Sequence, residues 1–361
     1  MGYRLRGHTG SSCACAEGAD QCRGGQGDVH VHDEWRVLRG RVERRAQNKR
    51  GSRMRRIAVM AICGLALLAC AWRGAFDDSY FAGKATGCYG GYITNYTLDG
   101  TNWTAHIFTN VGTTNFIVLG GTLDCEVLVV AGGGGGGQQG GGGGAGGVIV
   151  TNLKVSAGIY DVIVGKGGQP HAVSTATLTN GSNSVFGDLS AYGGGAGAPS
   201  DNAGNAGPNN GGSGGGSSPW PGLYEDHRSG GTGVVGQGHD GGYNYCTGPY
   251  MEDMGHSGGG GKGGVGGWST NGIAGNGGIG ITNAFSGETK GYAGGGGGGM
   301  RKLATRSTAQ DGGGAGGDFV VVSSQIAGEA GEANTGGGGG GGPEGRLGGE
   351  GGSGIVIIRY Q

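Results

Sequence analysis

The sequence CEVLVVAGGGGGGQQGGGGGAGGVIV, from Cys125 to Val150, decides how the rest of the chain is interpreted. Two apolar runs, Val127–Val130 and Val148–Val150, have the composition of buried strands, and between them lie residues with almost no side chain. Glycine loses more backbone entropy on folding than any other residue, so one interpretation of Gly132–Gly137 is a loose linker. The other is a structure that only glycine permits.

Composition favours the second interpretation. The chain has 361 residues and 100 glycines, and 81 of these lie among the 231 residues from Ala131 onward. Collagen reaches this density, but it needs a strict Gly-X-Y period and abundant proline, and the chain has neither. Disordered tracts are usually highly charged and poor in β-branched residues. Here β-forming runs such as Val148–Gly165 and Gly354–Tyr360 flank the glycine-rich block, which predicts a folded domain.

The charge is distributed unevenly along the chain. The first 56 residues hold 13 of the 25 Lys and Arg residues and 6 of the 26 acidic residues, which leaves the remainder with a formal charge of −8. Nucleic-acid binding needs a concentrated basic face, so an acidic body argues against nucleic acid as a partner.

Residues 54–71 have the layout of a secretory signal peptide. Two arginines precede the apolar stretch Ile57–Leu68, which is too short to span a bilayer of ~30 Å as a helix. Leu67–Cys70 also resembles a bacterial lipobox, in which Cys70 becomes the lipidated first residue. Ordinary secretion and an uncleaved anchor remain alternatives. We therefore expect an extracellular or cell-surface protein, including an outer-membrane lipoprotein, that meets the membrane only through a lipid anchor.

The regions beside the signal peptide receive simple assignments. Because a signal peptide begins a protein, residues 1–53 are interpreted as a disordered, non-native upstream extension, and residues 72–91 as a linker. Export permits disulfides. We expect Cys88 to pair with Cys125, since both lie in the strand-rich part, although spacing alone does not choose the pair.

Residues 92–192 alternate short β-runs with turn residues. Gly120-Gly121 separates Thr114–Leu119 from Cys125–Val130, and Ala157-Gly158 separates two further runs, Val148–Val155 and Ile159–Val164. Strands of this length and spacing predict an antiparallel, jelly-roll-like β-sandwich, closed by a last strand in residues 353–361. No sustained helical period follows residue 75, so the predicted fold is all-β, with negligible helix outside the signal peptide.

Glycine runs recur through residues 193–352, with polar segments between them. An extended left-handed helix has three residues per turn and no internal hydrogen bonds, so its backbone groups all point outward. Without side chains, such helices can approach closely and bond to one another on every side, which satisfies buried backbone groups without an apolar core. We therefore predict a packed array of polyglycine II helices.

An ordered series of anchors accompanies the glycine runs. It comprises EVLVVAGGGGGG, DVIVGKGG, NSVFGDL and the terminal GSGIVIIRY. Over roughly residues 100–361 the chain resembles the glycine-rich domain of bacterial surface proteins and phage tail-tip adhesins, and is similar to the glycine-rich region of anaplastic lymphoma kinase receptors. The resemblance implies a β-sandwich frame joined to a polyglycine II array whose end loops bind a target. The signal peptide departs from the phage proteins, which are assembled in the cytoplasm.

No pattern in the chain provides a catalytic site. Its G-x-G-x-x-G matches lie inside glycine runs, and glycine follows both Gly165-Lys166 and Gly261-Lys262, which excludes a nucleotide fingerprint and a P-loop. We expect no enzyme activity and no cofactor. His227, His239 and His256 are possible metal ligands, but their spacing matches no ligand template, so no metal is predicted.

The segment Ser217–His256 interrupts the glycine runs with aromatic and charged residues, and we expect it to form loops at the tip of the array. Loops on a rigid scaffold often carry function, and Tyr or Trp beside polar groups is typical of binding surfaces. The alternative is that these residues cap the array against water. Trp268 and the insert Met300–Asp311 are interpreted as solvated turns between helices of the array, with a further tip loop as the alternative. The candidate ligand-binding residues are Trp220, Tyr224, Asp226, His227, Arg228, His239, Asp240, Tyr243, Tyr245 and Tyr250.

These patterns predict a non-catalytic, secreted or surface-anchored protein. It would bind a surface glycan or protein through the tip loops, as an adhesin does. The alternative function is a purely structural spacer of the cell envelope or matrix.

Overall fold

The structure is a computed structural model, and the residues that it describes belong to one compact unit, Asp78–Gln361. It describes residues 85–170, 178–200, 207–219, 225–247, 254–301, 305–319 and 325–361, with the backbone alone for residues 225–226 and 246–247. The upstream extension, the signal peptide and Cys70 therefore lie outside the described residues. Across these ranges the regular elements are strands, and no helix is long and apolar enough to cross a membrane. The predicted all-β class is confirmed.

Most strands form one antiparallel eight-stranded sheet, in the order β2-β3-β12-β4-β5-β6-β7 with β1 paired to β4. Two small hairpins, β8-β9 and β10-β11, stand apart from it. The bounds are β1 Gly87–Tyr89, β2 Tyr92–Leu98, β3 Thr101–Phe108, β4 Gly112–Val130, β5 Val148–Val164, β6 Ser184–Phe186, β7 Leu189–Ala191, β8 Glu225–Arg228, β9 Asn244–Thr247, β10 Ile281–Asn283, β11 Lys290–Tyr292 and β12 Ile355–Tyr360. β1 lies inside the segment that the sequence marked as linker.

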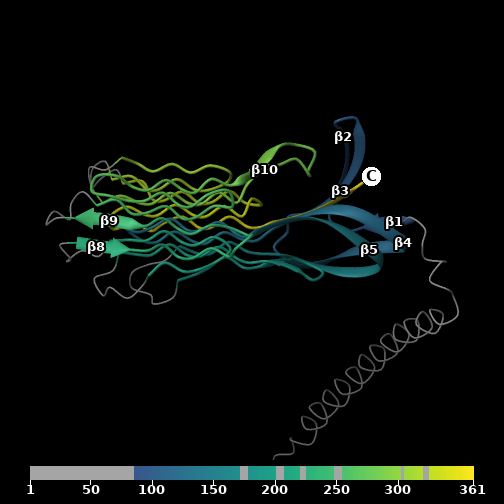
Figure 1. Cartoon of the computed structure of the whole chain (residues 1–361), viewed down its shortest axis with the longest axis horizontal. Helices are drawn as coiled ribbons and strands as arrows, with labels where there is room; N and C mark the ends of the chain where they lie inside the picture. The colour runs from purple at the N-terminus through teal and green to yellow at the C-terminus, as the bar shows by residue number, and fades with distance from the viewer. Residues whose placement is uncertain are drawn as a thin grey trace, which may run out of the picture. The chain divides into compact units, whose positions relative to one another are not determined.

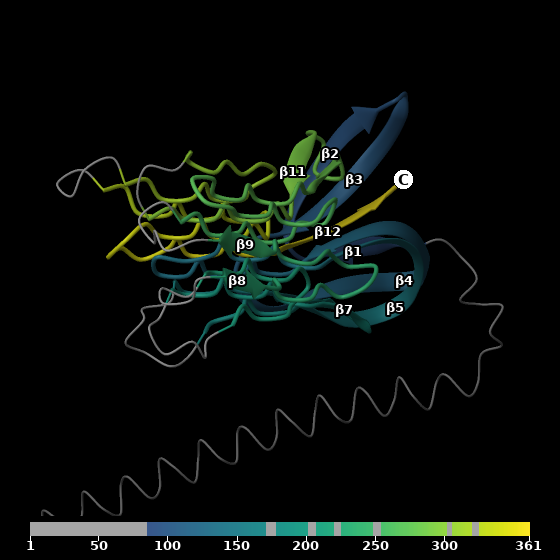
Figure 2. The same ribbon diagram turned by 60° about the vertical axis from the view of Figure 1, so that its left-hand side comes forward.

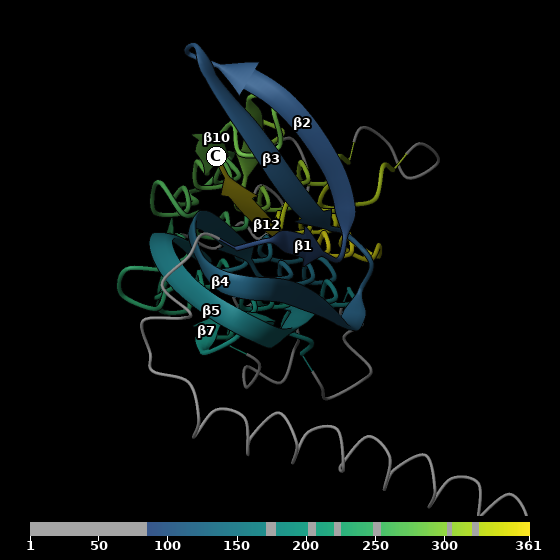
Figure 3. The same ribbon diagram turned by 90° about the vertical axis from the view of Figure 1, so that its right-hand side faces the viewer.

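The β4-β5 ladder is continuous and bends in its middle (Figure 3). Gly120 and Gly121 both have a φ of 59°, in the left-handed region that glycine adopts readily, and the register shifts between Val118 and Thr122. The sequence predicted a strand break at these glycines and another at Ala157-Gly158. Both predictions were wrong, because the glycines bend the strands through a bulge without ending them.

This bend lets one sheet enclose its own core. Phe116 and Val129 belong to the same buried cluster, although a straight strand would hold them roughly 40 Å apart at ~3.3 Å per residue. The Phe116 ring also contacts that of Phe186, with centroids 5.9 Å apart. These strands therefore belong to one hydrogen-bonded sheet that curves around its core, and the predicted jelly-roll-like sandwich is not confirmed.

The last strand of the chain lies in the centre of this sheet. β12 pairs with β3 on one side and with β4 on the other, and Val356, Ile357 and Ile358 are fully buried. Its apolar run, IVIIRY, has no polar alternation, as expected of a strand covered on both faces. The predicted closing strand is confirmed at Ile355–Tyr360.

The glycine runs form a packed array that extends from one end of the sheet (Figure 1). Successive residues of 142–147 donate backbone hydrogen bonds of 2.8–3.0 Å to three neighbouring segments in turn, with a period of three residues. The bonds run from Gly142 to Ser257, Gly143 to Gly339, Gly144 to Gly195, Ala145 to Gly260, Gly146 to Gly336 and Gly147 to Tyr192. This outward, threefold bonding is the pattern predicted for polyglycine II helices.

The array depends on missing side chains. A Cβ built at Gly134 would overlap the carbonyl oxygen of Gly195, and one at Gly143 would overlap that of Gly134. Both overlaps are with backbone, which cannot turn aside as a flexible side chain can. The glycine runs therefore build an ordered lattice that other residues would force apart.

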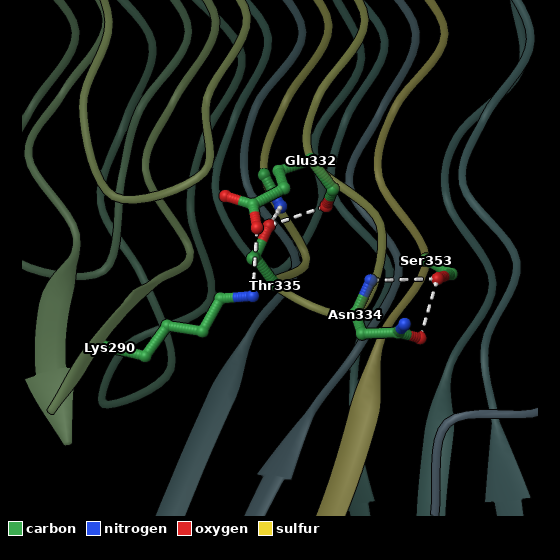
Figure 4. A network of polar contacts seen from close by, with 6 residues as sticks. Lys290, Glu332, Asn334, Thr335 and Ser353 are labelled. Carbon is green, nitrogen blue, oxygen red and sulfur yellow. Dashed lines mark hydrogen bonds and ion pairs between the residues drawn. The ribbon is translucent and has the colours of Figure 1, made fainter. Parts of the chain in front are cut away.

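Polar side chains secure the array where it meets the sheet (Figure 4). The backbone amide of Asn334 donates to Ser353 Oγ, just before β12, at 2.9 Å. Lys290 of β11 forms a 2.8 Å ion pair with Glu332. Thr335 Oγ1 donates to the Glu332 carbonyl at 2.6 Å. These contacts fix the segment that leads from the array into the central strand.

Candidate binding surface

The hairpin β8-β9 lies at the end of the array opposite to the large sheet (Figure 1, Figure 2). Its register places His227 opposite Tyr245 and Arg228 opposite Asn244. The Tyr245 amide also donates to the Ser269 carbonyl at 2.9 Å, which brings the loop containing Trp268 beside β9. Two segments distant in sequence therefore meet at this end.

Four aromatic rings gather there, and we call His227, Tyr243, Tyr245 and Trp268 the terminal aromatic cluster. The centroid of His227 lies 4.6 Å from that of Tyr245 and 6.3 Å from that of Tyr243, and Tyr243 lies 6.1 Å from Trp268. Tyr245 is 53% exposed and Trp268 is 68% exposed. Large exposed rings at the end of a rigid element form a surface suited to contact.

A chain of buried hydroxyl groups supports this cluster from below. Ser257 Oγ lies 3.1 Å from Ser217 Oγ and 2.8 Å from Ser269 Oγ, and Ser269 Oγ donates to Asn244 Oδ1 at 2.9 Å. Ser257 Oγ also contacts the Tyr243 carbonyl at 3.0 Å. Asn244 lies between Tyr243 and Tyr245, and Ser269 directly follows Trp268. These hydrogen bonds therefore fix the loops that carry the three rings.

The sequence predicts that Ser217–His256 lies at the tip of the array. In the structure only part of this segment lies there. From Arg228 the chain runs back along the array to a turn at Gly236, roughly 25 Å at ~3.1 Å per residue. There the Gln237 carbonyl accepts from the Val148 amide at the start of β5. The chain then returns to Tyr243. The side chains between Arg228 and Tyr243 have no periodicity that marks the direction of the chain, so the sequence concealed this excursion.

Two candidate residues therefore lie in the body of the array. The Asp240 carboxylate accepts from the Gly233 amide at 2.8 Å, and the His239 Nδ1 atom is 3.3 Å from the Gly261 carbonyl oxygen. Both side chains bond to neighbouring helices of the array and do not join the terminal aromatic cluster, and their role in ligand binding stays a prediction. Arg228, in contrast, lies half-buried beside the cluster.

The remaining candidates fall on residues that the structure does not fully describe. Trp220, Tyr224 and Tyr250 lie outside the described residues, and of Asp226 the structure describes the backbone alone, paired with Cys246 in β8-β9. Trp268 was not among the candidate residues, because the sequence favoured a solvated turn there over a tip loop. Its large ring among glycines and small polar residues was a signal, but only tertiary structure places it beside Tyr243.

The three histidines considered as metal ligands do not converge. His227 is exposed in the terminal aromatic cluster, His239 lies in the array, and His256 is buried with its Nδ1 atom 2.9 Å from Ser218 Oγ. Burial, with a smaller contribution from the nearby Arg301, lowers the pKa of His256 to about 3. Within the described ranges, no group of three or more His, Cys, Asp or Glu residues could hold a metal.

Cys88 and Cys125 are both free thiols in this structure, so the predicted disulfide between them is not formed there. Both belong to the core of the bent sheet, where the Tyr360 hydroxyl interacts with the Cys88 sulfur. Burial raises the pKa of Cys125 to about 12, with smaller contributions from Cys88 and Asp124. A thiol with this pKa stays protonated and unreactive at neutral pH.

We expect Cys125 to resist alkylation in the native protein and to react once the protein is denatured. Mass spectrometry of peptides, after labelling with and without denaturant, measures this directly. Unreduced protein in which neither Cys88 nor Cys125 reacts even in denaturant would show that the disulfide forms. Rapid native labelling of Cys125 would contradict the buried position of its thiol.

Comparison with known proteins agrees with this architecture. No curated protein matched the chain. A family model described as a glycine-rich domain matches residues 109–361, which include most of the sheet and the whole array. The chain belongs to this glycine-rich domain family.

Proposed function

We propose that the chain is a non-catalytic binding protein of the cell surface, and that the terminal aromatic cluster contacts a surface glycan or protein. The observation that carries the proposal is the exposure of Tyr245 and Trp268 at the end of a rigid array, on loops fixed by buried hydroxyl groups. Rigid aromatic side chains give large contact area at a low cost in conformational entropy. The array would then serve to hold this surface away from the sheet.

Export is part of the same proposal. The predicted signal peptide in residues 54–71 would direct the chain out of the cytoplasm, and lipidation at Cys70 would attach it to a membrane. The terminal aromatic cluster would then face the surroundings of a bacterial cell.

The test compares the full-length chain with a Tyr245→Ala/Trp268→Ala variant in binding to bacterial cells. We expect the variant to bind at least about tenfold more weakly, because central aromatic residues dominate interface energetics. A matched control is Tyr89→Ala/Tyr92→Ala, which removes two exposed rings, 56% and 71% accessible, from the large sheet. This control should bind as the unaltered chain does.

Limited proteolysis serves as the folding control for all three proteins. Equal binding by both variants would refute the role of the terminal aromatic cluster. Protease-resistant proteins that bind no cells at all would favour the alternative function, a structural spacer whose aromatic residues cap the array.

A further inference from the structure

The large sheet carries a hollow of about 810 Å³ on the part of its surface remote from the array. β12 leaves the array at Ile355 and ends at Tyr360, and the hollow lies at this far end, beside Gln361. We call it the sheet hollow. The lining residues that matter here are Trp103, Asp124, Glu126, Asn152, Lys154 and Gln361.

Strand register arranges these side chains in two rows across β12, β4 and β5. Arg359 lies opposite Glu126, which lies opposite Asn152, and Asp124 lies opposite Lys154 in the adjacent row of the same face. Figure 3 shows β3, β12, β4 and β5 following one another across the sheet. Residues from β3, β4 and β5, together with Gln361 just after β12, therefore line the sheet hollow.

The charges of the sheet hollow are balanced by fixed partners. Glu126 Oε2 accepts from Arg359 Nε at 2.7 Å and from Nη2 at 2.6 Å, and Asp124 forms a 3.3 Å ion pair with Lys154. The Arg359 guanidinium is further held 4.0 Å from the ring centroids of Trp103 and of Phe285. A charged ligand would meet no uncompensated charge on these four side chains.

What these residues offer is an aromatic ring beside hydroxyl-binding groups. Carboxylates accept hydrogen bonds, an ammonium group donates them, and the amides of Asn152 and Gln361 do both. The backbone beneath Arg359 is already paired with β3 and with β4, so a peptide cannot add a strand there. Side chains must therefore carry the recognition.

We propose that the sheet hollow binds a neutral saccharide, with a sugar face against Trp103 and sugar hydroxyls bonded to Asp124, Asn152 and Lys154. Its volume lies within the range of small-molecule sites and accommodates a short oligosaccharide. This site is separate from the terminal aromatic cluster. The chain would then bind one partner at each end, with the array as the spacer between them.

The test uses the full-length chain and a panel of neutral mono- and oligosaccharides, with uronic acids and amino sugars as charged counterparts, measured by isothermal titration calorimetry. We expect binding of neutral sugars and at least a tenfold loss of affinity in Asp124→Ala/Lys154→Ala. This change preserves net charge and affects two side chains that are 77% and 66% exposed. Asn152→Ala, at a second exposed position, should also weaken binding.

The matched control is Lys290→Ala/Glu332→Ala, which removes another partly exposed ion pair, 40% and 59% accessible, outside the sheet hollow. It should keep the affinity of the unaltered chain, as should the Tyr245→Ala/Trp268→Ala variant. If the Tyr245→Ala/Trp268→Ala variant lost saccharide binding, the sugar would bind at the terminal aromatic cluster, and the proposal would be overturned. Absence of binding by the folded chain, a preference for charged sugars, or equal loss in the control would overturn it too.

Discussion

Replacing Gly134 by alanine is expected to destabilise the folded protein by roughly 3 kcal/mol, near the upper end for overpacking a dense interior. The added methyl group would overlap the Gly195 carbonyl oxygen, and neither backbone can yield without breaking other bonds of the lattice. The Gly134 amide itself donates to Gly144 at 2.8 Å, and its carbonyl accepts from Gly339 at 3.0 Å. Denaturant unfolding followed by circular dichroism measures the loss, and limited proteolysis detects a variant that does not fold.

The matched control is Gly207→Ala in the same glycine-rich region. A Cβ at Gly207 meets no atom of the described residues within 4 Å, and Gly207 is not among the described glycines with positive φ. The control should keep or slightly raise stability, because alanine restricts the unfolded chain more than glycine does. Equal stability of the two variants would contradict the packed array, since a loose linker would accept alanine at either position.

His256 is expected to make the protein sensitive to acid. Its pKa is about 3 in the folded state, chiefly because of burial, whereas an unfolded histidine titrates near 6.5. Between about pH 6.5 and pH 3, His256 is therefore protonated in the unfolded state but neutral in the folded state. Its contribution to the free energy of unfolding is complete above about pH 6.5 and is lost as the pH falls toward 3. The largest loss is on the order of 5 kcal/mol, at 1.36 kcal/mol per pKa unit.

The measurement is the free energy of unfolding between pH 8 and pH 4 for the unaltered chain and for His256→Asn. Asparagine can keep a hydrogen bond to Ser218, the partner of His256 Nδ1, but it does not titrate. The variant should be less stable at pH 8 and should lose less stability in acid. His227→Asn controls for removal of an exposed histidine. Identical pH profiles for His256→Asn and the unaltered chain would refute the assignment.

Side-chain pattern made the strands predictable. The apolar runs Cys125–Val130 and Ile355–Tyr360 indicate buried strands by themselves, and both lie in the sheet. Their partners were not predictable, because a two-residue period gives the faces of a strand and says nothing of its neighbours. Pairing of the chain's last strand with β3 and β4 depends on contacts across more than 200 residues.

Some residues of the candidate binding surface could be predicted from the sequence and others could not. Tyr243 and Tyr245 stand out in the sequence as aromatic residues among glycines, and they do lie in the terminal aromatic cluster. Trp268 has the same signal, but a solvated turn was predicted there, with a tip loop only as the alternative. The Asp240 side chain, predicted at the tip, bonds between two helices of the array. Distance along a glycine-rich chain does not give position, because the chain reverses direction without a change in composition.

The all-β class and the glycine lattice are predictable from the sequence, because they follow from local side-chain pattern and from the absence of side chains. Which segments lie side by side is not predictable in this way. Every polyglycine helix offers the same outward backbone groups to any neighbour, so its choice of partner is set by the folded sheet and by the few polar residues, such as Asn334 and Ser353, that secure its ends.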